Sequence, residues 1–389
     1  MKNESESPRL MSLDALRGFD MLFIMAFSQA VVAFCAWIGS PDSWFAQQMT
    51  HVSWHGLRHH DTIFPLFLFL AGVSWPFSLA SQRAKGRSTG RIVLKIVRRM
   101  FLLTLLGVMT PVFFAFEFAK YRYDSVLAHI GVCWAGAAFL YLFVKSWKAR
   151  LAVVGSLLVG HWLVLWLCRA PDMAALLAST DPFTVKKLAA YAATGTDGFS
   201  FVGNFAGWID RTFLPGALYE GIFDPDGVLA KLTGVVTASL GVFAGELLRK
   251  EGLSGNRKTL LLAAAGAACL ALTFVWQPWC PVNKKIWTST FVLAVGAYSF
   301  GMLALFYWLV DVRGWRKWTF FFRVIGMNSI TIYVLMWVVD FGRVSRYFLS
   351  GVAALGDAHW SALVFALGRV AAEWLVLLYL YRKQTFLRV

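Results

Sequence analysis

Long apolar segments constrain the fold of this chain more than any other feature. Roughly ten segments approach the length of about 20 residues that a helix needs to cross a bilayer. Hydrophobic residues make up 58% of the 389 residues and charged residues only 15%, which is outside the range of soluble domains. We therefore expect an all-α, polytopic membrane bundle. The expected spans are 13–38, 61–82, 94–116, 124–144, 151–168, 228–248, 259–277, 287–311, 320–340 and 360–381.

The basic residues predict the orientation of these spans. A net charge of +16 would suggest a nucleic-acid partner in a soluble chain, but here the basic residues form short clusters between apolar segments. We therefore expect that the protein has no nucleic-acid partner. The clusters all fall on one side of the bilayer, which the positive-inside rule makes cytoplasmic. Both termini are then cytoplasmic, and the loops 41–60 and 169–227 face the opposite side. The clusters are 83–91, 145–150, 249–258, 312–317 and the C-terminal tail.

The domain count follows from the loops. No loop is long enough for an ordinary independent domain, so residues 1–389 are expected to form a single transmembrane domain. The segment near 169–227 is rich in Gly, Pro and Asp and is expected to cap the bundle on the extracytoplasmic side. The first apolar segment is expected to remain as a span, because it lacks the cleavage site of a signal peptide. The five cysteines are scattered singly and predict neither disulfides nor a zinc site.

Three charges lie inside the first span. Asp14, Arg17 and Asp20 are spaced i, i+3, so Arg17 can reach both acids on adjoining helical faces. An isolated charge near the bilayer centre costs about 2.5 to 3.5 kcal/mol on insertion scales. One interpretation is a mutually satisfied triad that orients the helix. The other is a cation that lines a cavity open to the cytoplasm.

Four histidines and an aspartate precede the second span, in HVSWHGLRHHD at 51–61. His51, His55 and His59 repeat every four residues, which on a helix would place them on one face as metal ligands. A second interpretation is a belt of interfacial histidines beside Trp54. A third is that one histidine acts as a general base or acyl acceptor at an outward-facing cleft, because imidazole suits proton transfer near neutral pH.

The loop 203–229 gathers polar side chains around aromatic residues and glycines. Hydrogen-bonding groups beside aromatic rings are what a sugar site needs, although turns rich in acidic residues have the same composition. Lys284, Lys285 and Trp287 near the outer end of the eighth span are also typical of simple interfacial anchors.

Five strings, in order along residues 9–333, resemble the heparan-alpha-glucosaminide N-acetyltransferase family, which includes bacterial NagX-like membrane proteins. The strings are RLMSLDALRGFD, HVSWHGLRHHDTIFPLFLFLAG, GNFAGWIDRTFLP with FDPDGVL, NKKIWTSTFVL and GMNSITIYV. The resemblance implies a transmembrane acyltransferase that takes acetyl-CoA from the cytoplasm and acetylates the amine of a glucosamine across the membrane. The implied partners are acetyl-CoA, an amino-sugar acceptor and the lipid bilayer, with a homodimer left open and no metal expected.

The resemblance also implies roles for residues of these strings. His51 stands at the position of the family's catalytic histidine, before Trp54 in the W-H-G-L string, and Asp61 opens the D-x-x-F-P motif. Substrate contacts are implied for Trp54 and for the residues that match the middle and NKKIW strings. These residues are Asn204, Asp210, Arg211 and Trp287.

The donor needs cations for its phosphates near the cytoplasmic side. Topology makes Arg17, Arg98, Arg99 and Arg323 available there, and Asn328 is a polar residue within an apolar helix that is expected to line the path of the donor. Hydrogen bonding between helices is the alternative role of Asn328.

The chain departs from the family pattern in three places. Ser28 stands where relatives carry an asparagine, and 126–130 reads VLAHI where relatives carry an arginine in V-L-Q-R-I. The large extracytoplasmic N-terminal region of the animal lysosomal enzyme is not found, which favours the bacterial inner membrane as the location.

Two mechanisms and three functions stay open from sequence. His51 either deprotonates the glucosamine ammonium, with Asp61 orienting its ring or binding the sugar, or carries a transient acetyl group. An amino-sugar transporter and an O-acetyltransferase of an envelope glycan are the alternatives to the N-acetyltransferase.

Overall fold

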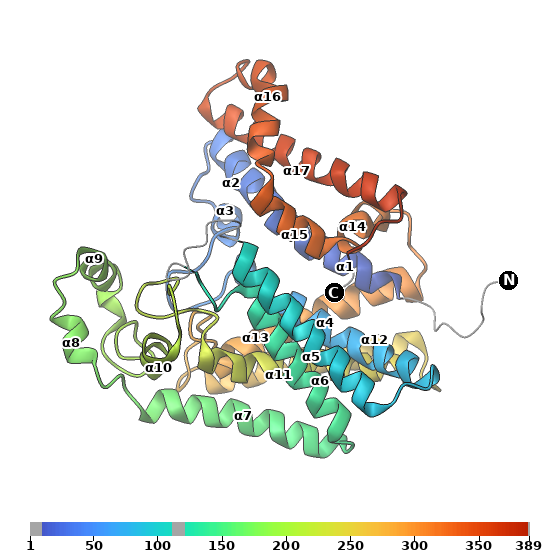
Figure 1. The fold of residues 1–389 in the computed structure, drawn as a ribbon. Helices are drawn as coiled ribbons and strands as arrows, with labels where there is room; N and C mark the ends of the chain where they lie inside the picture. Colours follow the sequence, from blue (N-terminus) through green and yellow to red (C-terminus); the bar gives the residue numbers. More distant parts are fainter. Residues whose placement is uncertain (1–9, 111–120, 388–389) are drawn as a thin grey trace.

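The computed structural model describes residues 10–110 and 121–387, and all its regular elements in these ranges are helices (Figure 1). The helices up to the capping segment are α1 (Met11–Leu22), the π-helix η1 (Phe23–Phe27), α2 (Ser28–Trp37), α3 (Trp44–Gln48), α4 (His59–Ala84), α5 (Thr89–Met109), α6 (Val126–Phe143) and α7 (Trp147–Leu167). The capping segment holds α8 (Met173–Leu177), α9 (Pro182–Ala190), the 3-10 helix η4 (Ala192–Thr194) and α10 (Phe205–Phe213). The rest are α11 (Val228–Arg249), α12 (Gly255–Trp276), α13 (Ser289–Tyr307), the π-helix η5 (Trp308–Val312), α14 (Thr319–Gly326), α15 (Ser329–Val338), α16 (Phe341–Ala353) and α17 (Ala358–Arg382).

The expected all-helical, polytopic membrane bundle is confirmed. Within the described ranges, eight helices are long and apolar enough to cross a membrane, and the pair α14 and α15, bent by 66°, is a candidate for a ninth. The expected span 94–116 overlaps α5, which is not among the eight and carries Lys95, Arg98 and Arg99. Its last expected residues, 111–116, lie outside the described ranges.

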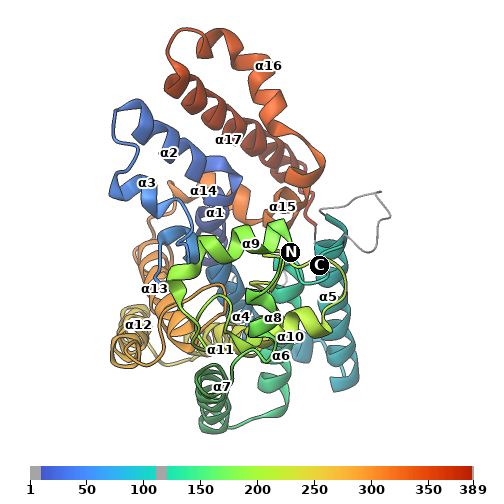
Figure 2. The same cartoon turned by 90° about the vertical axis from the view of Figure 1, so that its left-hand side faces the viewer.

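The bundle has two groups of helices and a cap (Figure 1). Helices α4 to α7 and α11 to α13 form one group, while α2 and α14 to α17 form the other, with α1 between them. Figure 2 looks onto one end of the bundle and shows α8, α9 and α10 lying across it. A separate apolar cluster lies under this cap, with Trp54, Phe199, Phe201 and Phe223 among its buried residues. That 169–227 caps a single domain stays a prediction, and this arrangement is compatible with it.

Glycines let α4 and α11 approach at backbone distance. A Cβ on Gly72 of α4 would lie 2.0 Å from the carbonyl oxygen of Ala238, and a Cβ on Gly241 of α11 would lie 2.0 Å from that of Phe69. Such contacts are typical of membrane helices, which associate through close packing of small residues because lipid provides no hydrophobic drive between them. The middle of α4, the helix that follows the histidine loop, is therefore packed directly on α11.

The first span is broken near its middle. Met25 and Ala26 leave helical geometry inside η1, and Ala26 has a φ of 70°, which is unusual for a residue other than glycine. π-Type segments and positive φ values concentrate where a side chain has to be re-aimed. The break lies immediately before Ser28, the first residue of α2.

We predict that Gly241→Ala destabilises the protein by about 1 to 3 kcal/mol, because the added methyl group would overlap the α4 backbone. Thermal unfolding in detergent measures the change. The matched control is Gly155→Ala on α7, where an added Cβ meets nothing within 4 Å. Equal melting temperatures for the two variants would contradict the proposed role of this contact.

Candidate active site

A buried carboxylate in the first turn of α4 organises the site. Asp61 is 1% exposed, and its Oδ2 accepts hydrogen bonds from the backbone N–H groups of Arg58 (3.1 Å) and Val52 (3.3 Å). Its Oδ1 lies 2.7 Å from Nδ1 of His51. The carboxylate thus closes the first turn of α4 and holds the preceding loop against it.

The loop before α4 is fixed by contacts that do not form a helix. Arg58 donates from Nη1 to Thr50 Oγ1 (2.7 Å) and to the carbonyl of His51 (3.2 Å). Gly56 has a φ of 118°, which favours glycine, and its N–H donates to the carbonyl of Val282 (2.8 Å). Since α4 begins only at His59, the interpretation of the histidines as one helical face of metal ligands does not hold. Within 10–110 and 121–387, no group of three or more His, Cys, Asp or Glu side chains is arranged to hold a metal.

His51 presents a reactive ring edge. Its side chain is 53% exposed, whereas the Asp61 side chain that it contacts is 1% exposed. We assign the hydrogen on Nδ1 to the bond with Asp61, which leaves Nε2 with a free lone pair. An imidazole held in this way can act as a general base or as a nucleophile.

Lys284 enters the site from the segment before α13. Its Nζ lies 3.2 Å from Nδ1 of His51 and 3.5 Å from Oδ1 of Asp61. Burial lowers the pKa of Lys284 below its ordinary value, while the charges of Asp61 and Asp226 act in the opposite direction. The interpretation of Lys284 as an interfacial anchor was therefore wrong, and only its place in the NKKIW string could have indicated a site.

The neighbours of Lys284 have different roles. Asn283 Nδ2 lies 3.3 Å from Nδ1 of His55, which adds a second contact between this segment and the histidine loop. Lys285 points away, since its Nζ donates to Glu220 Oε1 and to the hydroxyl of Tyr191, both at 2.6 Å. This ion pair ties the segment to the cap.

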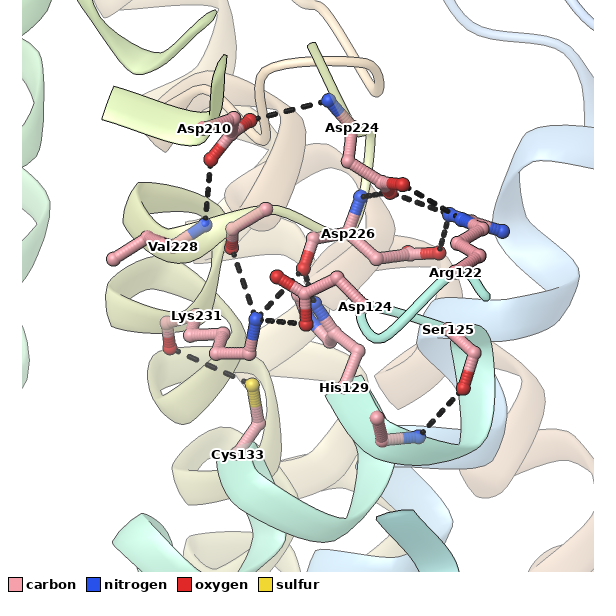
Figure 3. Close-up of polar contacts among 12 residues, drawn as sticks. Arg122, Asp124, Ser125, His129, Cys133, Asp210, Asp224, Asp226, Val228 and Lys231 are labelled. Atoms are coloured by element: carbon pink, nitrogen blue, oxygen red, sulfur yellow. Dashed lines mark hydrogen bonds and ion pairs between the residues drawn. The ribbon is translucent and has the colours of Figure 1, made fainter. Parts of the chain in front are cut away.

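A second polar cluster joins the cap to α6 and α11 (Figure 3). Arg122 donates from Nε to Asp224 Oδ2 (2.6 Å) and from Nη2 to Asp226 Oδ2 (2.7 Å). Lys231 of α11 pairs with Asp124 and donates to the carbonyl of Asp226 (3.0 Å). We call Arg122, Asp124, Asp224, Asp226 and Lys231 the cap network; sequence reasoning missed Arg122, Asp124 and Lys231, which belong to none of the strings.

The cap network borders the candidate site. The Trp287 ring lies 4.5 Å from the ring of His129, whose Nδ1 donates to the Asp226 carbonyl (3.3 Å). Lys284 and Asp226 are close enough for their charges to interact. Burial raises the pKa of Asp226 to about 6 although the Arg122 charge opposes this, and burial raises that of Asp210 to about 7.

The five residues predicted to contact substrate are occupied by structural contacts. Trp54 is 3% exposed and donates to the carbonyl of Phe199 (2.8 Å), and Trp287 is fully buried. Asn204 caps α10 by accepting from Gly207 N (2.7 Å). Asp210 accepts from Val228 N (2.9 Å) and Arg211 pairs with Asp172. Direct contact with substrate stays a prediction, and these bonds indicate that the residues hold the frame of the site.

Two of the predicted donor arginines lie near enough to each other for their charges to interact, and Arg17 contacts α4. Arg17 pairs with Asp14 (3.8 Å) and donates to Ser74 of α4. Arg99 stacks on Trp134 at 4.2 Å, its Nε is buried with no hydrogen-bond partner in the described structure, and its charge interacts with that of Arg17. The buried Nε of Arg99, beside the guanidinium group of Arg17, can donate to a bound anion.

The remaining residues of the first-span and donor predictions are more dispersed. Asp20 is buried, and its Oδ2 has no hydrogen-bond partner in the described structure. A mutually satisfied triad would need a bond from Arg17 to Asp20, and this oxygen accepts none from the described residues. Arg98 is exposed on α5 and Arg323 lies in the last turn of α14. Asn328 is buried between α14 and α15 and accepts from Thr331 (3.3 Å). Their contact with a donor stays a prediction.

Comparison with known proteins gives relatives over most of the chain. A human protein named heparan-alpha-glucosaminide N-acetyltransferase is 30% identical over 373 residues, covering 84% of this chain and 52% of the human protein. The mouse protein of the same name is 28% identical over 432 residues, covering 99% of this chain and 61% of the mouse protein. The chain therefore spans between half and two thirds of these relatives. A family model described as a domain of unknown function, DUF5009, matches residues 9–119.

The cap network predicts a pH-dependent stability. Burial raises the pKa of Asp226 from 3.8 to about 6, so between these values the folded chain holds a proton that the unfolded chain has lost. The free energy of unfolding should therefore fall as the pH rises through this window, by up to about 1.4 kcal/mol per pH unit from this group. Asp226→Asn removes that contribution. Melting temperatures in detergent from about pH 4 to 7 test this, and Asp42→Asn on an exposed loop is the control. An unchanged slope in Asp226→Asn would contradict the prediction.

Proposed function

We propose, because the chain belongs to the family of the heparan-alpha-glucosaminide N-acetyltransferases, that it is a membrane-embedded enzyme that transfers the acetyl group of acetyl-CoA to the amine of glucosamine or a terminal glucosaminide. The observation that carries this proposal is the His51–Asp61 pair, with a 2.7 Å contact between a half-exposed imidazole and a buried carboxylate. A positioned imidazole can act as the proton acceptor in acyl transfer to an amine.

The chemistry needs a neutral amine next to a thioester carbonyl. As the amine nitrogen forms its bond to the carbonyl carbon, His51 Nε2 accepts a proton from that nitrogen, and Asp61 stabilises the imidazolium that forms. The C–S bond then breaks, and the proton passes from His51 to the leaving thiolate. The alternative order, through an acetyl group on His51 Nε2, uses the same free lone pair.

Lys284 contributes charge to this centre. Its ammonium group lies beside both His51 and Asp61, so it compensates the buried carboxylate and adds positive potential where a tetrahedral intermediate would carry negative charge. Asp61 and Lys284 therefore act through the position and charge state of His51.

The donor is proposed to enter from the cytoplasmic side. Arg17 contacts Ser74, which is thirteen residues beyond Asp61 on α4, and at 1.5 Å rise per residue this places Arg17 about 20 Å along the helix from the carboxylate. Phosphates bound at Arg17 and Arg99 would leave a thin arm to reach the thioester site along α4. The positions of the basic clusters support cytoplasmic termini and an outward-facing His51. Location in a bacterial inner membrane stays a prediction from sequence.

A transporter is the second candidate, and one observation favours it. The pair α14 and α15 is bent by 66° around the buried Asn328, and broken helices are common at transporter binding sites. The two functions differ in outcome, because a transporter moves the sugar without changing it. An O-acetyltransferase of an envelope glycan would use the same His51–Asp61 pair on a hydroxyl.

We predict that His51→Ala abolishes acetyl transfer from labelled acetyl-CoA to glucosamine, with a loss of at least about a hundredfold, because the proton acceptor is removed. His55→Asn, in the same loop, is the matched control and should retain most of the activity. Transfer assays on purified protein and melting temperatures of both variants give the result. Native protein that takes up labelled glucosamine into liposomes and acetylates nothing would favour the transporter instead.

We predict that Arg99→Gln raises the KM for acetyl-CoA about tenfold, equivalent to the loss of about 1.4 kcal/mol of charge-assisted binding, with little change in the KM for glucosamine. The control is Arg257→Gln, an exposed basic residue at the start of α12. An unchanged donor KM in Arg99→Gln would remove this arginine from the donor site.

A further inference from the structure

A second imidazole lies against His51. His60, in the first turn of α4, has its ring centroid 4.5 Å from that of His51, with the two planes inclined by 59°. The two rings come from different backbone segments, one from the loop and one from the helix, so their contact is made by the fold and not by sequence neighbours.

The hydrogen bonds of Ser28 determine which nitrogen of His60 is free. The single hydroxyl hydrogen of Ser28 is donated to the carbonyl of Phe23 (3.0 Å). The Ser28 oxygen can then only accept at its 3.2 Å contact with Nδ1 of His60, so Nδ1 carries the hydrogen. The lone pair of His60 is therefore on Nε2, as it is in His51.

The break in the first span supports this arrangement. Residues Met25 and Ala26 leave helical geometry just before Ser28, and Ala26 adopts a positive φ. The Ser28 hydroxyl bonds to the carbonyl of Phe23 inside this break and to His60 in α4, so the break and the imidazole are linked through one side chain.

The other groups around His60 already have partners. Asp61 is bonded to His51 and two backbone N–H groups, and Lys284 contacts His51 and Asp61. The Nε2 atom of His59 lies 3.1 Å from the hydroxyl oxygen of Tyr298. These are the titratable groups that face the His51–His60 pair from the loop, α4, the segment before α13, and α13.

We propose that His60 is a second proton acceptor of the acyl-transfer centre, which takes the first proton from the acceptor ammonium and so leaves a neutral amine for His51. The inference rests on the proposed function. An ammonium has to lose two protons to become an amide nitrogen, and each imidazole can hold one.

The proton balance closes with these two residues. His60 Nε2 takes one proton from the ammonium and releases it to water before the second proton moves. His51 takes the second proton as the C–N bond forms. The C–S bond breaks, and the thiolate takes the proton from His51 to leave as the free thiol, so acetyl-CoA and an ammonium yield an amide, CoA and one proton.

The test is the pH–rate profile of His60→Asn with glucosamine as acceptor. The asparagine amide can donate to Ser28 in place of Nδ1–H, but it has no basic nitrogen. We expect kcat to fall about a hundredfold where the acceptor is an ammonium, and to approach the native value above about pH 8, where an amine as weakly basic as an α-amino group becomes neutral. His59→Asn is the matched control and should keep the native profile.

The outcomes separate the two claims. A native chain that transfers no acetyl group overturns the proposed function and this role with it. An active native chain whose His60→Asn variant shows the native profile, or an equal loss at every pH, overturns the role of His60 alone. Should the variant not fold, carbethoxylation of the native chain by diethyl pyrocarbonate tests whether His60 has a free ring nitrogen. We expect modification of His60, with the buried His161 as the unmodified control. An unmodified His60 overturns the assignment of a free lone pair to its Nε2, and the proposed role with it.

Discussion

The candidate site depends on the burial of one carboxylate at the start of α4. Asp61 is almost wholly buried, so its charge has to be matched by hydrogen-bond donors or cations nearby. The backbone N–H groups of Val52 and Arg58, the ring of His51 and the ammonium of Lys284 do this. Satisfying Asp61 therefore fixes the histidine loop and brings in the segment before α13. The same contacts leave the outer edge of His51 free.

The helical frame holds the elements of this small centre in place. Glycine contacts hold α4 on α11, and the cap network joins α11 and α6 to the loop that crosses their ends (Figures 2 and 3). Trp287 links the cap network to the candidate site. Its ring lies on His129, and it follows Lys284 by three residues in the sequence. Small errors in the position of a reacting group lower the reaction rate strongly. Contacts in the frame can therefore affect catalysis although they do not touch His51.

Sequence reasoning predicted the parts of this arrangement that depend on local pattern. Apolar length predicted the helices, and the ordered strings predicted the importance of His51 and Asp61, which lie only ten residues apart. The helical spacing of the histidines does not describe their arrangement, because the backbone turns at Gly56 and is extended at Arg58, immediately before the helix begins. Composition alone does not distinguish an interfacial tryptophan from one like Trp287 that is buried.

The contacts of Lys284 and Ser28 could not be predicted from local pattern. Lys284 reaches His51 across 233 residues, and Ser28 reaches His60 across 32. Both contacts depend on how helices pack, and in the first span on a break at an alanine, a residue that ordinarily favours helix. An isolated polar residue in such segments gives no indication of which partner it meets.

Sidedness tests the central claim of a transmembrane acetyl transfer most directly. Proteoliposomes can hold labelled acetyl-CoA inside, with glucosamine outside. Each protein then has one substrate on each side, and chains with the cytoplasmic face inward should form labelled N-acetylglucosamine in the outer solution. With both substrates outside and none inside, every chain lacks one substrate on its proper side, and no product should form. Product formed equally well with both substrates outside would contradict the account, because donor and acceptor would then reach His51 from the same side.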